Sequence, residues 1–205
     1  MRYEKVNPNL FQHTISGAFI LLRDFDTETG VIDPAEILAA TTEDTTFTAS
    51  PTWVNRFERI NGINGEYKEG MHNSGSTITF DGTAISSDDE FIRDLTALAG
   101  LQKSGGSLDS PTTLSTIVPR TDVLDSDFKD IWVVTNYGDN NSELSGGFLA
   151  IHLKNALSVN GLQIRGVNND YGTFPFSYKA FKTLEAQTEE AYEIFIRRST
   201  DSLLD

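Results

Sequence analysis

The feature that most constrains the fold is a series of short segments in which apolar and polar residues alternate. Alternation puts every second side chain on one face of a strand, so that one face is buried and the other meets solvent. In residues 77–81, for example, Ile78 and Phe80 are expected to point inward. Alternating segments or short apolar runs occur at 18–22, 45–49, 77–81, 131–134, 147–153, 162–165, 173–180 and 192–197. About eight short strands predict a mainly β fold, a sandwich or barrel.

One α-helix is expected beside these strands. Ser87 and the three acidic residues after it form a capping box with acids in the first turn, and Gly100 is expected to end the helix. Its apolar stripe consists of Phe91, Ile92, Leu95 and Leu98. We expect this helix to cover one face or one open end of the sheet. A second helix, of only one or two turns, is predicted from Asp33 and Pro34, a cap followed by proline at the first helical position.

A long irregular stretch between early strands, around residues 51–75, is the leading candidate for a contact surface. Loops longer than about 12–15 residues are usually functional or disordered, and this one is too aromatic to be disordered. Its positive and negative charges cancel, which suits a surface that touches another protein. The candidate contact residues are Trp53, Phe57, Arg59 and Tyr67. Alternatively, the aromatic residues fasten the loop to its own core. A Gly/Ser-rich connection at 103–111 is expected to be flexible.

Charge and composition exclude several classes of protein. The chain has 205 residues and a net charge of −14, from 30 acidic and 16 basic side chains, which argues against a surface that grips nucleic acid. The absence of cysteine excludes disulfide scaffolds, thiolate zinc sites and cysteine nucleophiles. No apolar run approaches the roughly 20 residues that span a bilayer, and no signal segment begins the sequence, so we expect no membrane anchor. We expect one domain over 1–205, with a short flexible tail at 199–205.

No motif for catalysis, a metal or a cofactor emerges, so none of the three is predicted. The histidines are isolated from one another: His13, His72 and His152. The acidic turn at 24–30 suggests calcium, but an EF-hand frame starting at Asp24 puts Thr29 and Ala35 where glycine and glutamate are required. A solvated turn is the favoured interpretation. A hydrolase built on scattered carboxylates stays open only because 30 acids always allow some pair in space.

The order of segments along the chain is more informative than any single motif. The segments are 17–26; 39–42 leading into 46–51; 117–122 and 125–132, a proline-arginine turn followed by a tryptophan strand; 147–158; and a closing pair, 172–180 and 191–196. Together they resemble the major tail tube proteins of long non-contractile tailed phages of Gram-positive bacteria. The resemblance covers nearly the whole chain. It departs at 70–75, where family members tend to carry a denser charged stretch and a tryptophan.

The resemblance implies a structural role without catalytic residues. The expected fold is a β-sandwich with one flanking helix, and the expected assembly is a hexameric ring whose inner strands form a continuous barrel. Stacked rings would form the tail tube around a tape measure protein, between tail terminator and distal tail proteins. DNA would pass through during genome ejection without specific binding. The protein would be part of the virion and would be assembled in the host cytoplasm.

The residues themselves add a stacking surface and a reason for the acidity. The loop around 51–75 is the candidate for contacts between rings, with Trp53, Phe57 and Tyr67 as anchors. Acidic side chains on a pore wall would repel phosphate and keep DNA mobile, or they serve only solubility. Two other functions stay open: the tube of a contractile tail or secretion apparatus, and a glycan-binding sandwich in which Trp53 and Tyr67 stack on sugars.

Overall fold

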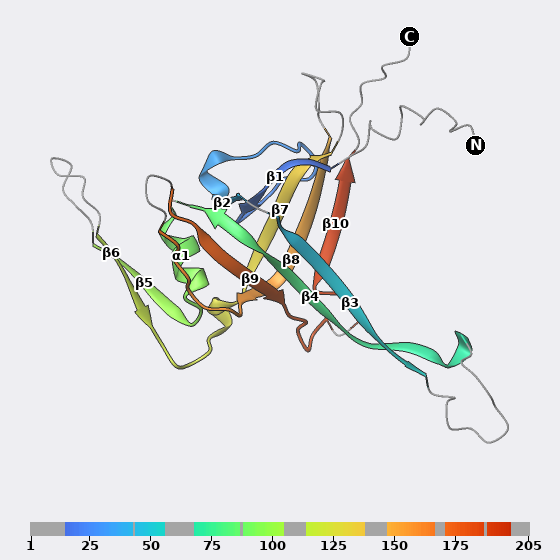
Figure 1. Cartoon of the computed structure of the whole chain (residues 1–205). Coiled ribbons are helices and arrows are strands. Elements are labelled where there is room, and N and C mark those ends of the chain that lie inside the picture. The colour runs from blue at the N-terminus through green and yellow to red at the C-terminus, as the bar shows by residue number, and fades with distance from the viewer. Residues whose placement is uncertain are drawn as a thin grey trace, which may run out of the picture.

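The computed structural model describes residues 15–42, 44–55, 68–86, 88–104, 114–137, 147–166, 171–186 and 188–197. Within these ranges the chain is mainly β with one α-helix, as predicted (Figure 1). The strands are β1 (Ile15–Leu22), β2 (Ile37–Thr41), β3 (Thr46–Asn55), β4 (Met71–Ile85), β5 (Ala99–Ser104), β6 (Leu114–Pro119), β7 (Lys129–Tyr137), β8 (Phe148–Ser158), β9 (Phe174–Ala180) and β10 (Tyr192–Arg197). The helices are α1 (Asp89–Leu95) and the 3-10 turns η2 (Pro34–Glu36), η3 (Lys68–Gly70) and η4 (Asp125–Asp127).

Six antiparallel strands close into a barrel. They follow the order β8, β7, β1, β2, β4, and β9 pairs with both β4 and β8 to complete the circle. β3 lies along β4 and β10 lies along β8, and these two are the edge strands of the described sheet. Pro175 was predicted to lie at an edge or bulge. It pairs with Thr83 of β4, and β8 pairs only with residues 178–180 of β9, so β8 does not cover the other side of β9 at Pro175.

The main core fills the barrel. Ile78 and Phe80 point inward as predicted, with 1% and 0% of their surfaces exposed. α1 contributes Phe91 and Leu95, both fully buried in the same cluster. A second cluster lies on the other face of β1, β7 and β8; it consists of Leu22, Phe25, Val134, Phe148 and Ala150. Because these strands are buried on both faces, their sequences are continuous apolar runs rather than alternating ones.

Two hairpins leave the barrel. β4 pairs with β9 only from Thr79 onward, so residues 71–76 of β4 pair with residues 51–55 of β3 alone. We call this two-stranded part the outer hairpin. β5 and β6 form a separate two-stranded sheet, which we call the side hairpin. Figure 1 shows the two hairpins pointing toward opposite sides of the view, the side hairpin to the left and the outer hairpin to the lower right.

Both stretches that the sequence marked as irregular contain paired strand. The predicted loop around 51–75 is wrong at its ends, because β3 continues to Asn55 and β4 begins at Met71. The ladder hydrogen bonds of this pair outweigh a composition that is typical of loops. The predicted flexible connection at 103–111 is wrong at its start, since β5 includes residues 103 and 104. Residues 56–67 and 105–113 lie outside the described part of the chain.

Three further predictions of local structure need correction. α1 is capped by Asp88 rather than Ser87 and ends at Leu95, because Ala97 and Leu98 have positive φ and Gly100 already belongs to β5. The predicted short helix from Asp33 is only the 3-10 turn η2, and β2 follows at once. The strand predicted at 162–165 is absent: within this segment, Arg165 forms an isolated bridge to Thr173.

Candidate functional site

The outer hairpin carries the described part of the predicted contact surface. Trp53 is 59% exposed and its neighbour Val54 is 40% exposed. Both lie in β3, where they pair with Asn73 and His72 of β4. More than half of the Trp53 side chain is therefore left uncovered by the rest of the protein. The other three candidates, Phe57, Arg59 and Tyr67, lie outside the described residues.

A bulge fixes the shape of the outer hairpin. The register shifts between Thr52, which pairs with Gly75, and Trp53, which pairs with Asn73, so Ser74 of β4 is the extra residue. The Ser74 hydroxyl donates to the Thr52 carbonyl at 3.1 Å, and the Gly75 amide donates to the Asn73 side chain at 2.9 Å. A bulge increases strand twist and makes an edge unsuited to indiscriminate pairing. The bulge thus distorts the edge that this hairpin presents.

An isolated two-stranded hairpin is at best marginally stable in water. In the outer hairpin, residues 51–54 are all exposed, so side-chain packing adds little to the stability that backbone pairing provides. Large exposed apolar side chains on such an element are typical of a surface that a partner covers. The geometry therefore favours a binding role for this hairpin over a role in the core.

The side hairpin is a second projecting element, and the sequence did not reveal it. Two hydrogen bonds tie it to α1 and the turn after it: the Ser115 hydroxyl donates to Asp89, and the Arg120 amide donates to the Leu98 carbonyl at 2.7 Å. Leu114 is 68% exposed and Val118 is 42% exposed. The alternation in residues 114–119 was the available signal, but the Gly/Ser composition before it indicated a linker.

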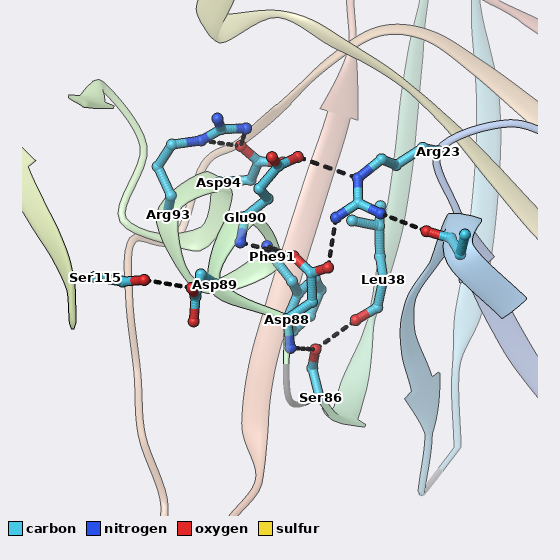
Figure 2. A network of polar contacts seen from close by, with 11 residues as sticks. Arg23, Leu38, Ser86, Asp88, Asp89, Glu90, Phe91, Arg93, Asp94 and Ser115 are labelled. Carbon is cyan, nitrogen blue, oxygen red and sulfur yellow. Dashed lines mark hydrogen bonds and ion pairs between the residues drawn. The ribbon is translucent and has the colours of Figure 1, made fainter. Parts of the chain in front are cut away.

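A polar network fixes α1 on the barrel (Figure 2). Arg23, at the end of β1, pairs with Asp88 and, at 3.1 Å, with Glu90, and it donates to the Ala35 carbonyl at 3.0 Å. Asp88 Oδ1 accepts the amides of Glu90 and Phe91 at 2.7 and 3.1 Å, which caps the helix. Burial works to raise the pKa of Asp88, but the hydrogen bonds from Arg23 and these amides outweigh it, so its pKa lies below the ordinary value.

The same network reaches the neighbouring elements. The Ser86 hydroxyl donates to the Leu38 carbonyl of β2 and accepts the Asp88 amide at 2.9 Å. On the other side of the helix, Asp89 accepts from Ser115 of β6 (Figure 2). α1 thereby sets the position of the side hairpin relative to the barrel. The residues involved are far apart in sequence, so no local motif marks this arrangement.

The acidic turn is occupied by its own hydrogen bonds. Asp26 Oδ1 accepts the Glu28 amide at 2.8 Å, and Asp26 Oδ2 accepts the Thr29 hydroxyl at 2.8 Å. The bond from Thr29 and the neighbouring amides lower the pKa of Asp26. Across the part of the chain that the structure describes, no group of three His, Asp or Glu side chains is arranged to hold a metal ion. The turn is thus explained as local structure.

His152 lies between two carboxylates. Its Nε2 is 3.3 Å from Asp130 and its Nδ1 is 3.9 Å from Glu193, so the two carboxylates contact opposite nitrogens. The ring stacks on Trp132 with centroids 4.2 Å apart. Asp130 lies in β7, His152 in β8 and Glu193 in β10, so these two contacts connect the three strands.

Comparison of the sequence with models of known protein families gives no match, and comparison with curated proteins gives no significant match. The helices in the described ranges do not have the length and apolar character that a bilayer crossing requires.

Proposed function

We propose that this protein is the subunit of a phage tail tube, which self-assembles into stacked hexameric rings and serves as the conduit for genome ejection. The observation that carries the proposal is the outer hairpin, which leaves the barrel with Trp53 and Val54 exposed. The order of segments that resembles the tail tube family supports the same proposal. No catalytic role is proposed.

The arrangement of the elements suits a stacked assembly. A ring requires a head-to-tail contact, and stacking requires a second surface on the same subunit. The barrel is closed by ladder hydrogen bonds, and the two hairpins project from it in different directions (Figure 1). Each hairpin offers a surface that the barrel leaves uncovered. A tape measure protein, a tail terminator and a distal tail protein would be the further partners.

The charge of the chain fits a conduit for DNA. With a net charge of −14, the assembled wall would repel phosphate and leave a hydrated gap. A basic wall would instead hold the duplex through many phosphate contacts. The protein would therefore contact DNA without affinity for it.

Electron microscopy of the purified protein tests the proposal. On concentration, or with its tape measure partner, the protein should form rings of six subunits with an open pore that stack into tubes. A protein that stays monomeric under all these conditions would contradict the proposal. A sheath protein that coats the tube would instead point to a contractile tail or a secretion apparatus.

A glycan-binding module is the second candidate, and the exposure of Trp53 is the observation that favours it. Exposed tryptophan rings stack on sugars, and Trp53 is 59% exposed. Titration with host wall polysaccharide should change tryptophan fluorescence if the module binds glycan, and should not change it for a tube subunit. The variant Trp53→Phe shows whether the fluorescence change comes from Trp53, because the only other tryptophan is Trp132, which is stacked on His152.

A further inference from the structure

A pocket of about 250 Å³ opens at the base of the side hairpin. Its walls come from the end of α1 and the turn that follows, from the start of β5, from η4, and from β7 and β8. Its charged and hydroxyl-bearing side chains are Arg93, Asp94, Arg120, Ser126, Asp127 and Lys129. This volume is below the roughly 300–1,000 Å³ of small-molecule sites and suits a single side chain.

Two of the cations in the pocket are already neutralised. Arg120 pairs with Asp127, whose side chain is only 6% exposed and whose second oxygen accepts the Leu124 amide at 2.8 Å. Arg93 pairs with Asp94, whose side chain is 14% exposed. These two pairs form part of the pocket wall, and neither arginine is available to a ligand without losing its carboxylate.

Lys129 is the third cation of the pocket, beside the two arginines that are paired with carboxylates. Among the described residues, its ammonium makes no hydrogen bond and no ion pair, and its charge acts on Asp94. Burial raises the pKa of Asp94, although Arg93 and Lys129 oppose this. Three cations against two carboxylates make the pocket locally positive, in a chain whose net charge is −14. The pocket is therefore complementary to an acidic group.

We propose that this pocket receives a carboxylate side chain from a second copy of the chain, with Lys129 as the pairing cation and the Ser126 hydroxyl as a further donor. The inference rests on the self-assembly proposed above. The volume admits an aspartate or glutamate but not a nucleic-acid duplex. A second copy supplies the partner because 30 of its residues are acidic and a ring contact brings different surfaces of two copies together.

Carbodiimide cross-linking tests this contact directly, because the reagent joins an amine to a carboxylate that touches it. Tubes are assembled from equal amounts of unlabelled and ¹⁵N-labelled protein, and cross-linked peptides are identified by mass spectrometry. We expect Lys129 to be joined to an aspartate or glutamate in pairs of mixed label. Lys182 is the internal control: it lies 3.0 Å from Glu190 of its own chain and should give pairs of a single label only.

A variant gives a second readout. Lys129→Gln should raise the protein concentration needed for half-maximal assembly about three- to fivefold, as expected for the loss of one partly desolvated charge pair. Lys182→Gln, the matched control, should assemble like the wild type. If tubes form but Lys129 gives no mixed-label pair and Lys129→Gln assembles normally, the pocket contact is overturned while the tail tube proposal stands. If no ring forms under any condition, both are overturned.

Discussion

The barrel and the two hairpins are stabilised in different ways. In the barrel, side chains such as Phe80 and Leu153 are fully buried, and most strands are paired on both sides. In the hairpins, the backbone is paired but Trp53, Leu114 and Val118 remain exposed. Hydrophobic burial dominates stability, so the barrel should determine whether the chain folds. The hairpins are free to serve contacts with other molecules, because changes there should alter assembly more than folding.

The largest expected effect on stability comes from the barrel core. Phe80 is 0% exposed, with its ring centroid 5.9 Å from that of Phe19 and 5.3 Å from that of Phe176. Phe80→Ala should lower the free energy of unfolding in urea by about 3–5 kcal/mol, because it leaves a cavity. Trp53→Ala, an aromatic truncation of the outer hairpin, should change it by less than about 0.5 kcal/mol. Equal losses in the two variants would remove the distinction between barrel and hairpin.

The cap of α1 should give an intermediate effect. Asp88→Ala removes the helix cap and the partner of Arg23, and should lower the free energy of unfolding at pH 7 by about 1–2 kcal/mol. Asp122→Ala, an exposed acid without a side-chain bond among the described residues, is the matched control and should have little effect. A loss no larger than that of the control would mean that α1 does not depend on this network.

The contribution of Asp88 should depend on pH. Its pKa in the folded state is lower than in the unfolded chain, so the stabilisation is fully present above about pH 4. It is lost as the pH falls through the folded-state pKa. The difference between wild type and Asp88→Ala, measured by urea unfolding at several pH values, should therefore shrink below about pH 4. A difference that grows in acid would contradict the assigned direction.

Loosening the side hairpin should have a smaller effect. Ser115→Ala removes its hydrogen bond to Asp89 and should lower the free energy of unfolding by about 0.5–1 kcal/mol. It should also speed tryptic cleavage after Lys103, which pairs with Ser115 in the hairpin register, because this end of the hairpin is less firmly tied to α1. Thr116→Ala, whose exposed side chain points away from this tie, provides the comparison. Unchanged cleavage would mean that the hairpin is positioned by other contacts.

The smallest effect on stability, and the largest on assembly, is expected in the outer hairpin. The double variant Trp53→Ala with Phe57→Ala should remain folded, with unfolding changed by less than about 0.5 kcal/mol, but should block tube extension in electron microscopy. Leu184→Ala, at an 86% exposed position outside both hairpins, should assemble normally. If the double variant unfolds, the aromatic residues fasten the hairpin to the core instead.

Local patterns predicted the barrel well. The strand that contains Ile78 and Phe80 buries one face, and its sequence alternates. β7 and β8 are buried on both faces, and their sequences are continuous apolar runs. Because the pattern of burial appears in the sequence, these strands could be predicted. The patterns failed where pairing or geometry overrides composition. The short helix predicted from Asp33 is limited to a 3-10 turn because β2 begins at Ile37, and the positive φ of Ala97 and Leu98 ends α1 early without a glycine.

The candidate site was predictable only in part. The exposure of Trp53 agrees with the predicted contact surface, whereas its place in a paired strand depends on the bulge and on partners in β4. The Arg23 to Asp88 pair and the pocket around Lys129 join segments that are distant in sequence. Such contacts are set by topology, so no spacing in the sequence indicates them.

Hydrogen exchange before and after assembly tests the central claim, that the barrel folds the chain while the hairpins serve contacts between copies. In the dilute subunit, amides of β8 should be strongly protected, whereas those of residues 52–55 and of β5 and β6 should exchange rapidly. In assembled tubes the hairpin amides should become protected and the β8 amides should stay as they were. Hairpin amides that exchange equally fast in the subunit and in the tube would contradict the claim.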